Sequence, residues 1–300
     1  MNTIKNDEPS PVKEGNIAIV TGANVGLGFE TALALAEKGM EVILAARNQK
    51  KAIHAMHVIK TRVPGAKLHF RKIDLGSLSS VREFAEYFQE EFRKLDLLVN
   101  NAGIMMPPYS LTQDGFESQF GTNFLGHFLL TGLLLPALKK GNGSRVVTLS
   151  SIAHKYGKIH FNDLNFSNNY DKMKAYSQSK LACLIFAYEL DRRFKDSGFP
   201  AISVGAHPGV SSTNLGYQLS PVLRYFFPKI GQSAEAGAKP VLMAASSPSL
   251  NGGEYCGPDG WLEMRGNPVL VGSTKISRDP EIARQLWEVS EKMVNHRYLF

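Results

Sequence analysis

The chain has 300 residues, of which 43% are hydrophobic and 20% charged, so it can bury a full core, and a single domain is expected. The formal net charge is +7, but the basic residues are scattered along the chain, which argues against a nucleic-acid partner. Cys183, in an apparent helix, and Cys256, in a late loop, do not suggest a disulfide framework, and the histidines lack metal-ligand spacing, so no metal site is expected.

The first residues, 1–14, are polar and lack the apolar core of a signal peptide, so they are expected to form a flexible tail ahead of a domain spanning residues 15–300. The most apolar helix-like stretch, residues 123–138, is interrupted by glycine, histidine and proline and is too short to cross a bilayer. We therefore expect no integral membrane segment and a cytoplasmic location.

Residues 16–30 read as a strand, a glycine-rich turn and the start of a helix. Glycines let the backbone approach a pyrophosphate closely, and the free N–H groups at a helix start favour an anion there. The residues expected to hold the phosphates are Gly22, Asn24, Gly26, Leu27 and Gly28. A tight connection between strand and helix, with no ligand, is the alternative.

Strand-like and helix-like runs alternate from there on. The predicted strands are residues 41–46, 67–73, 95–99, 144–149 and 201–206, and the predicted helices are 30–38, 49–62, 79–93, 115–139 and 172–193, with a terminal helix after residue 273. His54 and His57 fall on a predicted helix, where a solvated face is expected rather than zinc ligands. The alternation predicts an α/β fold of the Rossmann type, a doubly wound parallel sheet with helices on both faces. Ligands of such sheets bind outside the carboxyl ends of the strands.

The end of the second strand carries Arg47 where a unit that binds NAD would carry an acidic residue. A guanidinium there can bind the 2′-phosphate of NADP, so NADP(H) is predicted in preference to NAD, with an ordinary surface arginine as the alternative. Asp74 and Leu75 end the third strand. Asp74 can meet the adenine or cap the helix that follows.

Polar residues also follow the fourth and fifth strands. The sequence Asn100-Asn101-Ala102-Gly103 comes after the fourth strand, and Ser150-Ser151 after the fifth. Further on, Tyr176 and Lys180 lie four residues apart on a predicted helix and so share a face. A fixed cation favours the phenolate form of a tyrosine, which makes the pair a candidate acid/base device. Tyr170/Lys174 and Tyr225/Lys229 have the same spacing, but only Tyr176 leads into a sustained apolar helix.

These residues together resemble the short-chain dehydrogenase/reductase family. The matching motifs, in the family's order, are Thr21-Gly22-x-x-x-Gly26-x-Gly28, Asn100-Asn101-Ala102-Gly103, Ser151, Tyr176-x-x-x-Lys180 and His207-Pro208-Gly209. The resemblance implies NAD(P)-dependent oxidoreduction with Tyr176 as general acid/base, Ser151 holding the substrate oxygen, and Lys180 favouring the phenolate and binding the nicotinamide ribose.

The resemblance assigns further residues as well. Asn123 matches the family's fourth catalytic member, which supports a water relay, although an amide that packs a helix is the alternative. Ser150 is the alternative to Ser151 as the serine that holds the substrate oxygen. Asn101, Ala102 and Gly103 are expected at the cofactor, as are Pro208, Gly209 and Thr213, which resemble the segment that closes on the nicotinamide. A plain Pro-Gly turn is compatible with that role.

A closer resemblance is to the branch of retinol dehydrogenases and protochlorophyllide reductases. It rests on Ala46-Arg47-Asn48, on Ser151-Ile152-Ala153-His154, and on the long interval between Ser151 and Tyr176. The apolar segment 216–230 lies where the family has a substrate lid, with a packed helix or an oligomer contact as alternatives, so the lid is predicted around residues 211–231.

The resulting prediction is an NADP(H)-dependent oxidoreductase that interconverts a carbonyl, aldehyde or ketone, and an alcohol on an apolar small molecule. A reductase of carbon–carbon double bonds and a non-catalytic NADP-binding regulator are the alternatives. The resemblance also implies a possible homodimer or homotetramer.

Overall fold

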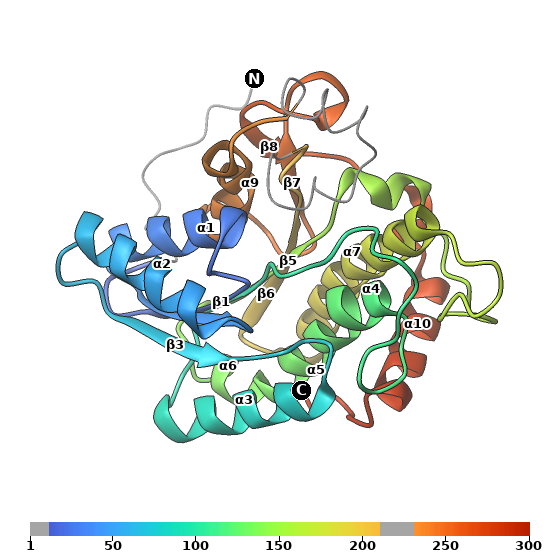
Figure 1. The fold of residues 1–300 in the computed structure, drawn as a ribbon, viewed down its shortest axis with the longest axis horizontal. Coiled ribbons are helices and arrows are strands. Elements are labelled where there is room, and N and C mark those ends of the chain that lie inside the picture. Colours follow the sequence, from blue (N-terminus) through green and yellow to red (C-terminus); the bar gives the residue numbers. More distant parts are fainter. Residues whose placement is uncertain (1–11, 211–230) are drawn as a thin grey trace.

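A single eight-stranded sheet runs through the part of the chain that the computed structural model describes, residues 12–210 and 231–300 (Figure 1). Its strand order is β3-β2-β1-β4-β5-β6-β7-β8, and every neighbouring pair is parallel except β7 and β8. The strands are β1 Ile17–Thr21, β2 Glu41–Ala46, β3 Leu68–Lys72, β4 Leu97–Asn100, β5 Ser144–Leu149, β6 Ala201–Ala206, β7 Tyr255–Pro258 and β8 Pro268–Leu270. The predicted Rossmann-type fold is confirmed.

The strand order reverses at β1, which pairs with β2 on one side and with β4 on the other. The chain runs outward to the edge at β3 and then crosses back to begin β4 beside β1. A crevice opens outside the carboxyl ends of the strands at such a reversal, because the connections on its two sides lead to opposite faces. The fold therefore fixes where a ligand would bind.

Alternate residues of each central strand face two separate cores. In β1, Ile17 and Ile19 belong to one core and Ala18 and Val20 to the other. Helices α1 (Gly26–Glu37), α2 (Gln49–Arg62) and α9 (Ala234–Ser246) cover one face of the sheet, and α3 (Leu78–Glu91), α5 (Gly126–Leu133), α7 (Lys172–Ser197) and α10 (Pro280–Met293) cover the other (Figure 1). Strands covered on both faces read as the continuous apolar runs from which they were predicted.

The predicted helix 115–139 is wrong as one element. It divides into α4 (Ser118–Phe120), a π-helical turn Gly121–Leu125, α5 and α6 (Leu135–Leu138). A Cβ on Gly126 would lie only 2.4 Å from the carbonyl oxygen of Leu75, so the helix presses against the end of β3 where a larger residue has no room. Pro136, which cannot donate a backbone hydrogen bond, lies in the first turn of α6.

Three further differences concern the ends of the domain. Val12, which the sequence assigned to the flexible tail, is buried in the core beneath α1. Cys256 lies in β7 and not in a loop. Strands β7 and β8 and helix α9 were not predicted, whereas the predicted terminal helix is confirmed as α10. The lid predicted around residues 211–231 falls almost wholly outside the described residues.

Helix α10 and the residues after it cover aromatic side chains of α5 and α7. The ring of Trp287 lies 5.0 Å from that of Phe128 between centroids, and the Tyr298 hydroxyl donates to the Phe128 carbonyl oxygen at 2.5 Å. The Arg193 guanidinium of α7 lies 4.2 Å from the centre of the Trp287 ring, a cation–π contact. The last residues are therefore part of the core on this face.

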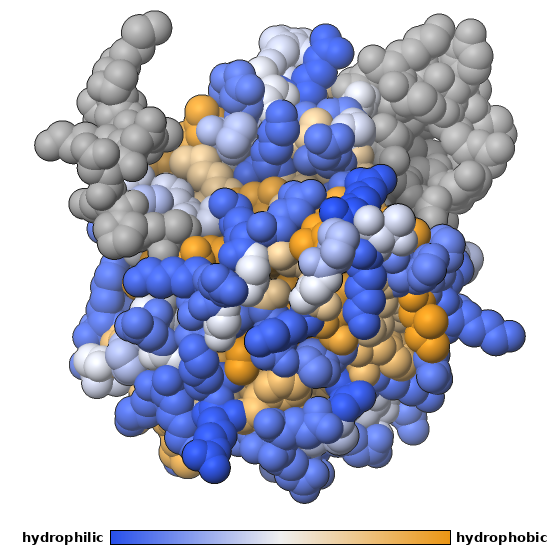
Figure 2. All heavy atoms as spheres, turned by 90° about the vertical axis from the view of Figure 1, so that its left-hand side faces the viewer, coloured by the Kyte–Doolittle hydropathy of each residue, from blue (hydrophilic) through white to orange (hydrophobic). Residues whose placement is uncertain are grey.

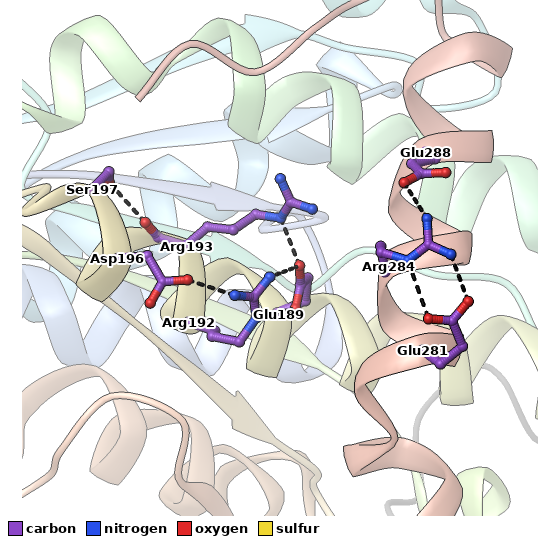
Figure 3. Close-up of polar contacts among 8 residues, drawn as sticks. All are labelled: Glu189, Arg192, Arg193, Asp196, Ser197, Glu281, Arg284 and Glu288. Carbon is purple, nitrogen blue, oxygen red and sulfur yellow. Dashed lines mark hydrogen bonds and ion pairs between the residues drawn. The ribbon is translucent and has the colours of Figure 1, made fainter.

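The outer surfaces of α7 and α10 carry ion pairs along each helix. On α7, Arg192 bridges Glu189 and Asp196, with nitrogen–oxygen distances of 2.7 and 2.5 Å, and Arg193 also reaches Glu189 (Figure 3). Arg284 of α10 bridges Glu281 and Glu288 in the same way (Figure 3). The Arg284 pairs of α10 are exposed, and pairs of this kind stabilise a helix by about 0.3–0.5 kcal/mol each, whereas the Glu189 carboxylate on α7 is only 3% exposed and largely removed from water.

The face that carries α2 and β3 is mainly hydrophilic (Figure 2). His54 and His57 are exposed there, as the sequence predicted. Across residues 12–210 and 231–300, no helix combines the length and the apolar character needed to cross a bilayer.

Candidate active site

A cavity of about 930 Å³ lies outside the carboxyl ends of the strands. It is lined by the glycine-rich loop after β1, the ends of β2 and β3, the turn after β4, the end of β5, the first part of α7 and the segment after β6. Of the predicted site residues that the structure describes, all but Asn123 line it. Its volume is within the range of cavities that bind small-molecule ligands.

The glycine-rich loop lines this cavity through Gly22 and residues 24–28. Gly22 and Gly26 adopt left-handed conformations with φ of 69° and 56°, which glycine takes without strain. Val25, the N-cap of α1, gives the first turn no side-chain acceptor, so the N–H groups at the helix start are left for a ligand. A cradle of this form suits the pyrophosphate of a dinucleotide.

Gly28 is required by close packing and not by its backbone conformation. A Cβ there would lie 2.4 Å from the Gly22 carbonyl oxygen and 2.6 Å from Asn101 Nδ2. Asn101 Nδ2 in turn donates to the Thr21 carbonyl oxygen at 2.6 Å. The glycine loop and the turn after β4 therefore form one closely packed unit.

Two cations line the cavity at the end of β2. Asn48 caps α2 by accepting a hydrogen bond from Lys51 N at 2.9 Å, and this first turn puts Lys51 beside Arg47 on the cavity wall. Residues four apart share one side of such a turn. Arg47 was predicted at this site and Lys51 was not, although the two lie four residues apart in the sequence.

Asp74 lines the cavity and shapes the turn after β3. Its Oδ1 accepts from Gly76 N at 3.0 Å, while Ser77 is the N-cap of α3. Asp74 is therefore not the helix cap that was one of its two predicted roles. Leu75 lies beside it on the same wall.

The turn Asn101-Ala102-Gly103 is held by backbone bonds at both ends. The N–H groups of Asn101 and Ala102 both donate to Thr21 Oγ1 at 2.9 Å. At the other end, Asn123 accepts from Ile104 N at 2.8 Å and donates to Ile104 O at 3.0 Å. The turn thus presents its small residues to the cavity in a fixed shape.

Asn123 itself is buried in the π-helical turn and does not line the cavity. Its Nδ2 also donates to Ser179 Oγ of α7 at 2.9 Å. Its amide is therefore an anchor between the turn after β4 and α7. The predicted part in a water relay stays a prediction.

The two serines after β5 have different environments. Ser150 is buried, and its hydroxyl donates to the Lys180 carbonyl oxygen at 2.7 Å. Ser151 is half-buried, and its Oγ accepts from Ala153 N at 3.2 Å. Its hydroxyl proton is therefore not committed by that contact, which leaves Ser151 the better placed of the two to donate to a ligand in the cavity.

Tyr176 and Lys180 lie in the first turns of α7 and both line the cavity. They are only 8% and 6% exposed, so both groups are largely removed from water. Lys180 Nζ donates to the Leu149 carbonyl oxygen at 3.2 Å, and a Cβ on Gly103 would come within 3.4 Å of it. The ammonium group is therefore held between β5 and the turn after β4.

The rival pair differs in both place and chemistry. Tyr170 does not line the cavity, and its hydroxyl donates to the Pro107 carbonyl oxygen at 3.1 Å. Burial, with the nearby Glu117 carboxylate, raises the pKa of Tyr170 to about 12, so it does not exchange protons readily at neutral pH. The pair Tyr225/Lys229 lies outside the described residues.

Pro208 and Gly209 line the cavity beyond β6. The N–H of Gly209 donates to His207 Nδ1 at 3.2 Å, so the proton of this imidazole is on Nε2, 3.1 Å from Glu263 Oε2. His207 and Lys155 both hold the pKa of Glu263 down, to about 2. Thr213, predicted to meet the nicotinamide carboxamide, lies outside the described residues.

Several lining residues were not predicted. Apart from Lys51, they include apolar residues that follow the predicted motifs: Ile104, Met105, Ile152 and Val210. They follow polar motifs directly in the chain, which is the one signal that could have found them. Together they contribute apolar surface to the lining of the cavity.

Comparison with known proteins identifies the family. The model of the family "short chain dehydrogenase" matches residues 16–221. Retinol dehydrogenase 13 from Homo sapiens is 42% identical over 292 residues, with 93% of this chain and 85% of that protein covered. Polyprenol dehydrogenase from Mus musculus is 41% identical over 287 residues, with 92% and 83% covered.

Solved structures support the same conclusion about the fold. A crystal structure of an uncharacterized protein from Mycobacterium paratuberculosis is 41% identical, covers 100% of both chains and has a TM-score of 0.81. Levodione reductase, at 19% identity and a TM-score of 0.63 over 78% of this chain and 91% of that one, shares the fold. The chain therefore belongs to the short-chain dehydrogenase/reductase family, in its retinol dehydrogenase-like branch, and is an oxidoreductase of CH–OH groups that uses a nicotinamide dinucleotide.

Proposed function

We propose that this enzyme uses NADP(H) to interconvert an alcohol and an aldehyde or ketone on an apolar small molecule, with Tyr176 as the general acid/base. The observation that carries the proposal is the meeting of Ser151, Tyr176 and Lys180 with the glycine-rich loop in one cavity.

The preference for NADP(H) is supported by the charge at the end of β2. Arg47 and Lys51 line the cavity there, and the cavity-lining residues of that strand end include no acidic side chain. The 2′-phosphate distinguishes NADP from NAD, and two cations can pair with it where a carboxylate would repel it.

The residues around Ser151 can move one proton and hold one oxygen. When bound, the nicotinamide supplies a hydride to the carbonyl carbon or takes one from the alcohol carbon. In reduction the Tyr176 hydroxyl gives its proton to the substrate oxygen, and in oxidation the Tyr176 oxygen takes that proton back. The Ser151 hydroxyl donates a hydrogen bond to the same oxygen, and the Lys180 ammonium, held by the Leu149 carbonyl oxygen, would bind the nicotinamide ribose.

An apolar substrate is supported by the apolar residues Ile104, Met105, Ile152 and Val210 that line the cavity. The names of the relatives, retinol and polyprenol dehydrogenases, point to apolar alcohols as well. A cavity lined by such side chains binds through the removal of apolar surface from water.

Titration of the enzyme with NADPH and with NADH tests the cofactor. Arg47→Leu and Lys51→Leu should each raise the dissociation constant for NADPH by about 10- to 100-fold, the worth of a charge-assisted hydrogen bond, and leave that for NADH nearly unchanged. Lys60→Leu, on the exposed side of α2 and outside the cavity, is the matched control. Tighter binding of NADH by the unaltered enzyme contradicts the proposal.

A panel of apolar alcohols, aldehydes and ketones, read through nicotinamide absorbance, tests the reaction. Tyr176→Phe should lower turnover on an accepted substrate by about 10²- to 10⁴-fold while cofactor binding persists. Tyr170→Phe removes a hydroxyl with the same spacing to a lysine but outside the cavity, and should keep its turnover. Full activity of Tyr176→Phe would refute the assignment.

A further inference from the structure

His127 lies in the first turn of α5 and joins two parts of the active site without lining the cavity. Its side chain is 1% exposed. Its Nδ1 lies 2.9 Å from the carbonyl oxygen of Asn123, and its Nε2 lies 2.9 Å from Thr21 Oγ1. One imidazole thus connects the end of β1 to the π-helical turn.

The chemistry of the two partners decides where the protons are. The Asn123 carbonyl oxygen can only accept, so Nδ1 carries the hydrogen. Burial, aided by the positive charge of Lys180, lowers the pKa of His127 to about 4, so the ring is neutral and Nε2 is an acceptor. The Thr21 hydroxyl therefore donates to His127, in preference to the Val99 carbonyl oxygen at 3.3 Å.

The direction of the hydrogen bond between Thr21 and His127 affects the turn after β4. With its proton on His127, Thr21 Oγ1 offers its lone pairs to the N–H groups of Asn101 and Ala102, both at 2.9 Å. The imidazole thereby orients the hydroxyl that holds the start of the cofactor-binding turn.

The Nδ1 atom of His127 acts, through Asn123, on the other end of the same turn. Asn123, whose carbonyl accepts from His127, clamps both backbone groups of Ile104 and donates to Ser179 Oγ. Ser179 Oγ donates to the carbonyl oxygen of Tyr176 at 2.8 Å. A chain of hydrogen bonds therefore runs from the glycine loop through His127 to the helix that carries the proposed acid/base.

We propose that His127 is a positioning residue, whose Nε2 fixes the cofactor-binding turn through Thr21 and whose Nδ1 fixes the catalytic side of the cavity through Asn123. The inference rests on the proposed function, because the two sides are assigned by it. The two nitrogens then have separable effects, one on cofactor affinity and one on turnover.

Two substitutions separate these effects. In His127→Asn the amide nitrogen takes the place of Nδ1, so the bond to Asn123 survives and the acceptor for Thr21 is lost. In His127→Gln the amide oxygen reaches the place of Nε2, so the acceptor for Thr21 survives and the bond to Asn123 is lost. Ser290→Ala is the control, since the buried Ser290 hydroxyl of α10 donates to the Leu286 carbonyl oxygen of its own helix, at 2.7 Å, and touches neither the imidazole nor the turn after β4.

The measurements are the dissociation constant for NADPH by fluorescence, kcat on an accepted substrate, and amide hydrogen exchange of residues 101–104. His127→Asn should raise the dissociation constant about five- to tenfold and speed exchange at Asn101 and Ala102. His127→Gln should lower kcat by a similar factor, about five- to tenfold, and speed exchange at Ile104. Ser290→Ala should lower the thermal midpoint and leave both constants unchanged.

Equal shifts of affinity and kcat in both His127 variants, or shifts matched by Ser290→Ala, would reduce His127 to a packing residue and overturn the proposal. If the His127 variants do not fold, Thr21→Val replaces the hydroxyl by a methyl and should reproduce the His127→Asn result. If the unaltered enzyme binds NADPH but turns over no alcohol or carbonyl, the proposed function fails, while affinity and exchange still test the role of His127.

Discussion

Replacing Gly28 with alanine puts one methyl group at the tightest point of the glycine loop. The added carbon would lie 2.4 Å from the Gly22 carbonyl oxygen and 2.6 Å from Asn101 Nδ2, so at least one must move. Asn101 cannot move freely, because its Nδ2 is bonded to the Thr21 carbonyl oxygen at 2.6 Å. Overpacking of this kind costs about 1–3 kcal/mol.

This substitution has two opposing effects on the free energy of unfolding, but only one of them, the overpacking, affects dinucleotide binding. Alanine is favoured over glycine inside a helix by about 1 kcal/mol, which offsets much of the overpacking in the free energy of unfolding. Binding has no such offset, so the dissociation constant for the dinucleotide should rise by about 5- to 150-fold. Fluorescence titration measures it, with Gly272→Ala, which meets nothing within 4 Å, as the control. An unchanged dissociation constant together with raised stability would refute the packing argument.

Acidification should destabilise the protein, because burial lowers the pKa of His154, His207 and His296 in the same direction as that of His127. The depressed pKa of buried His127, about 4 against 6.5 when unfolded, contributes stability that falls as pH drops from about 6.5, by about 3 kcal/mol once pH 4 is passed. Glu263, with its pKa lowered to about 2 from 4.5, adds a further loss between those two values. Urea unfolding at about pH 7.5 and about pH 5 checks the histidine contribution, and no loss between them would contradict it. Asp96 is 4% exposed and accepts from Ile17 N at 2.8 Å and Asn142 N at 3.1 Å, so Asp96→Ala should lower the free energy of unfolding by about 3 kcal/mol and Asp96→Asn by less. Equal losses in a urea titration would show that these bonds contribute nothing.

The strands of the sheet could be predicted from the sequence where they are continuous apolar runs. β1, β2 and β4 to β6 were found because each is covered on both faces, whereas β3, at the edge of the sheet, has only Leu68 buried. β7 and β8 were missed because Tyr255–Pro258 contains Gly257 and Pro258, and Pro268–Leu270 has only three residues. The π-helical turn at residues 121–125 meets Ile104 and Ser179 through Asn123, contacts between distant parts of the chain that no local pattern contains.

The site was predictable where motifs follow strand ends, since the topology gathers those ends at one edge of the sheet. Lys51 was not predicted because it lies in the first turn of the following helix, whereas Arg47 directly follows the strand. His127 escaped for a different reason: its two partners, Thr21 and Asn123, lie 106 and 4 residues away, and their meeting depends on how α5 packs beside β1.

The aromatic cover supplied by the last residues has a consequence for biosynthesis. The Tyr298 hydroxyl bonds to a carbonyl 170 residues earlier in the chain. At translation rates of about 5–20 residues per second, α5 leaves the ribosome roughly 10–30 s before its partner is made. During that interval Phe128 and its neighbours stand open to other nascent chains, so the yield of the enzyme should depend on chaperone capacity more than its final stability would suggest.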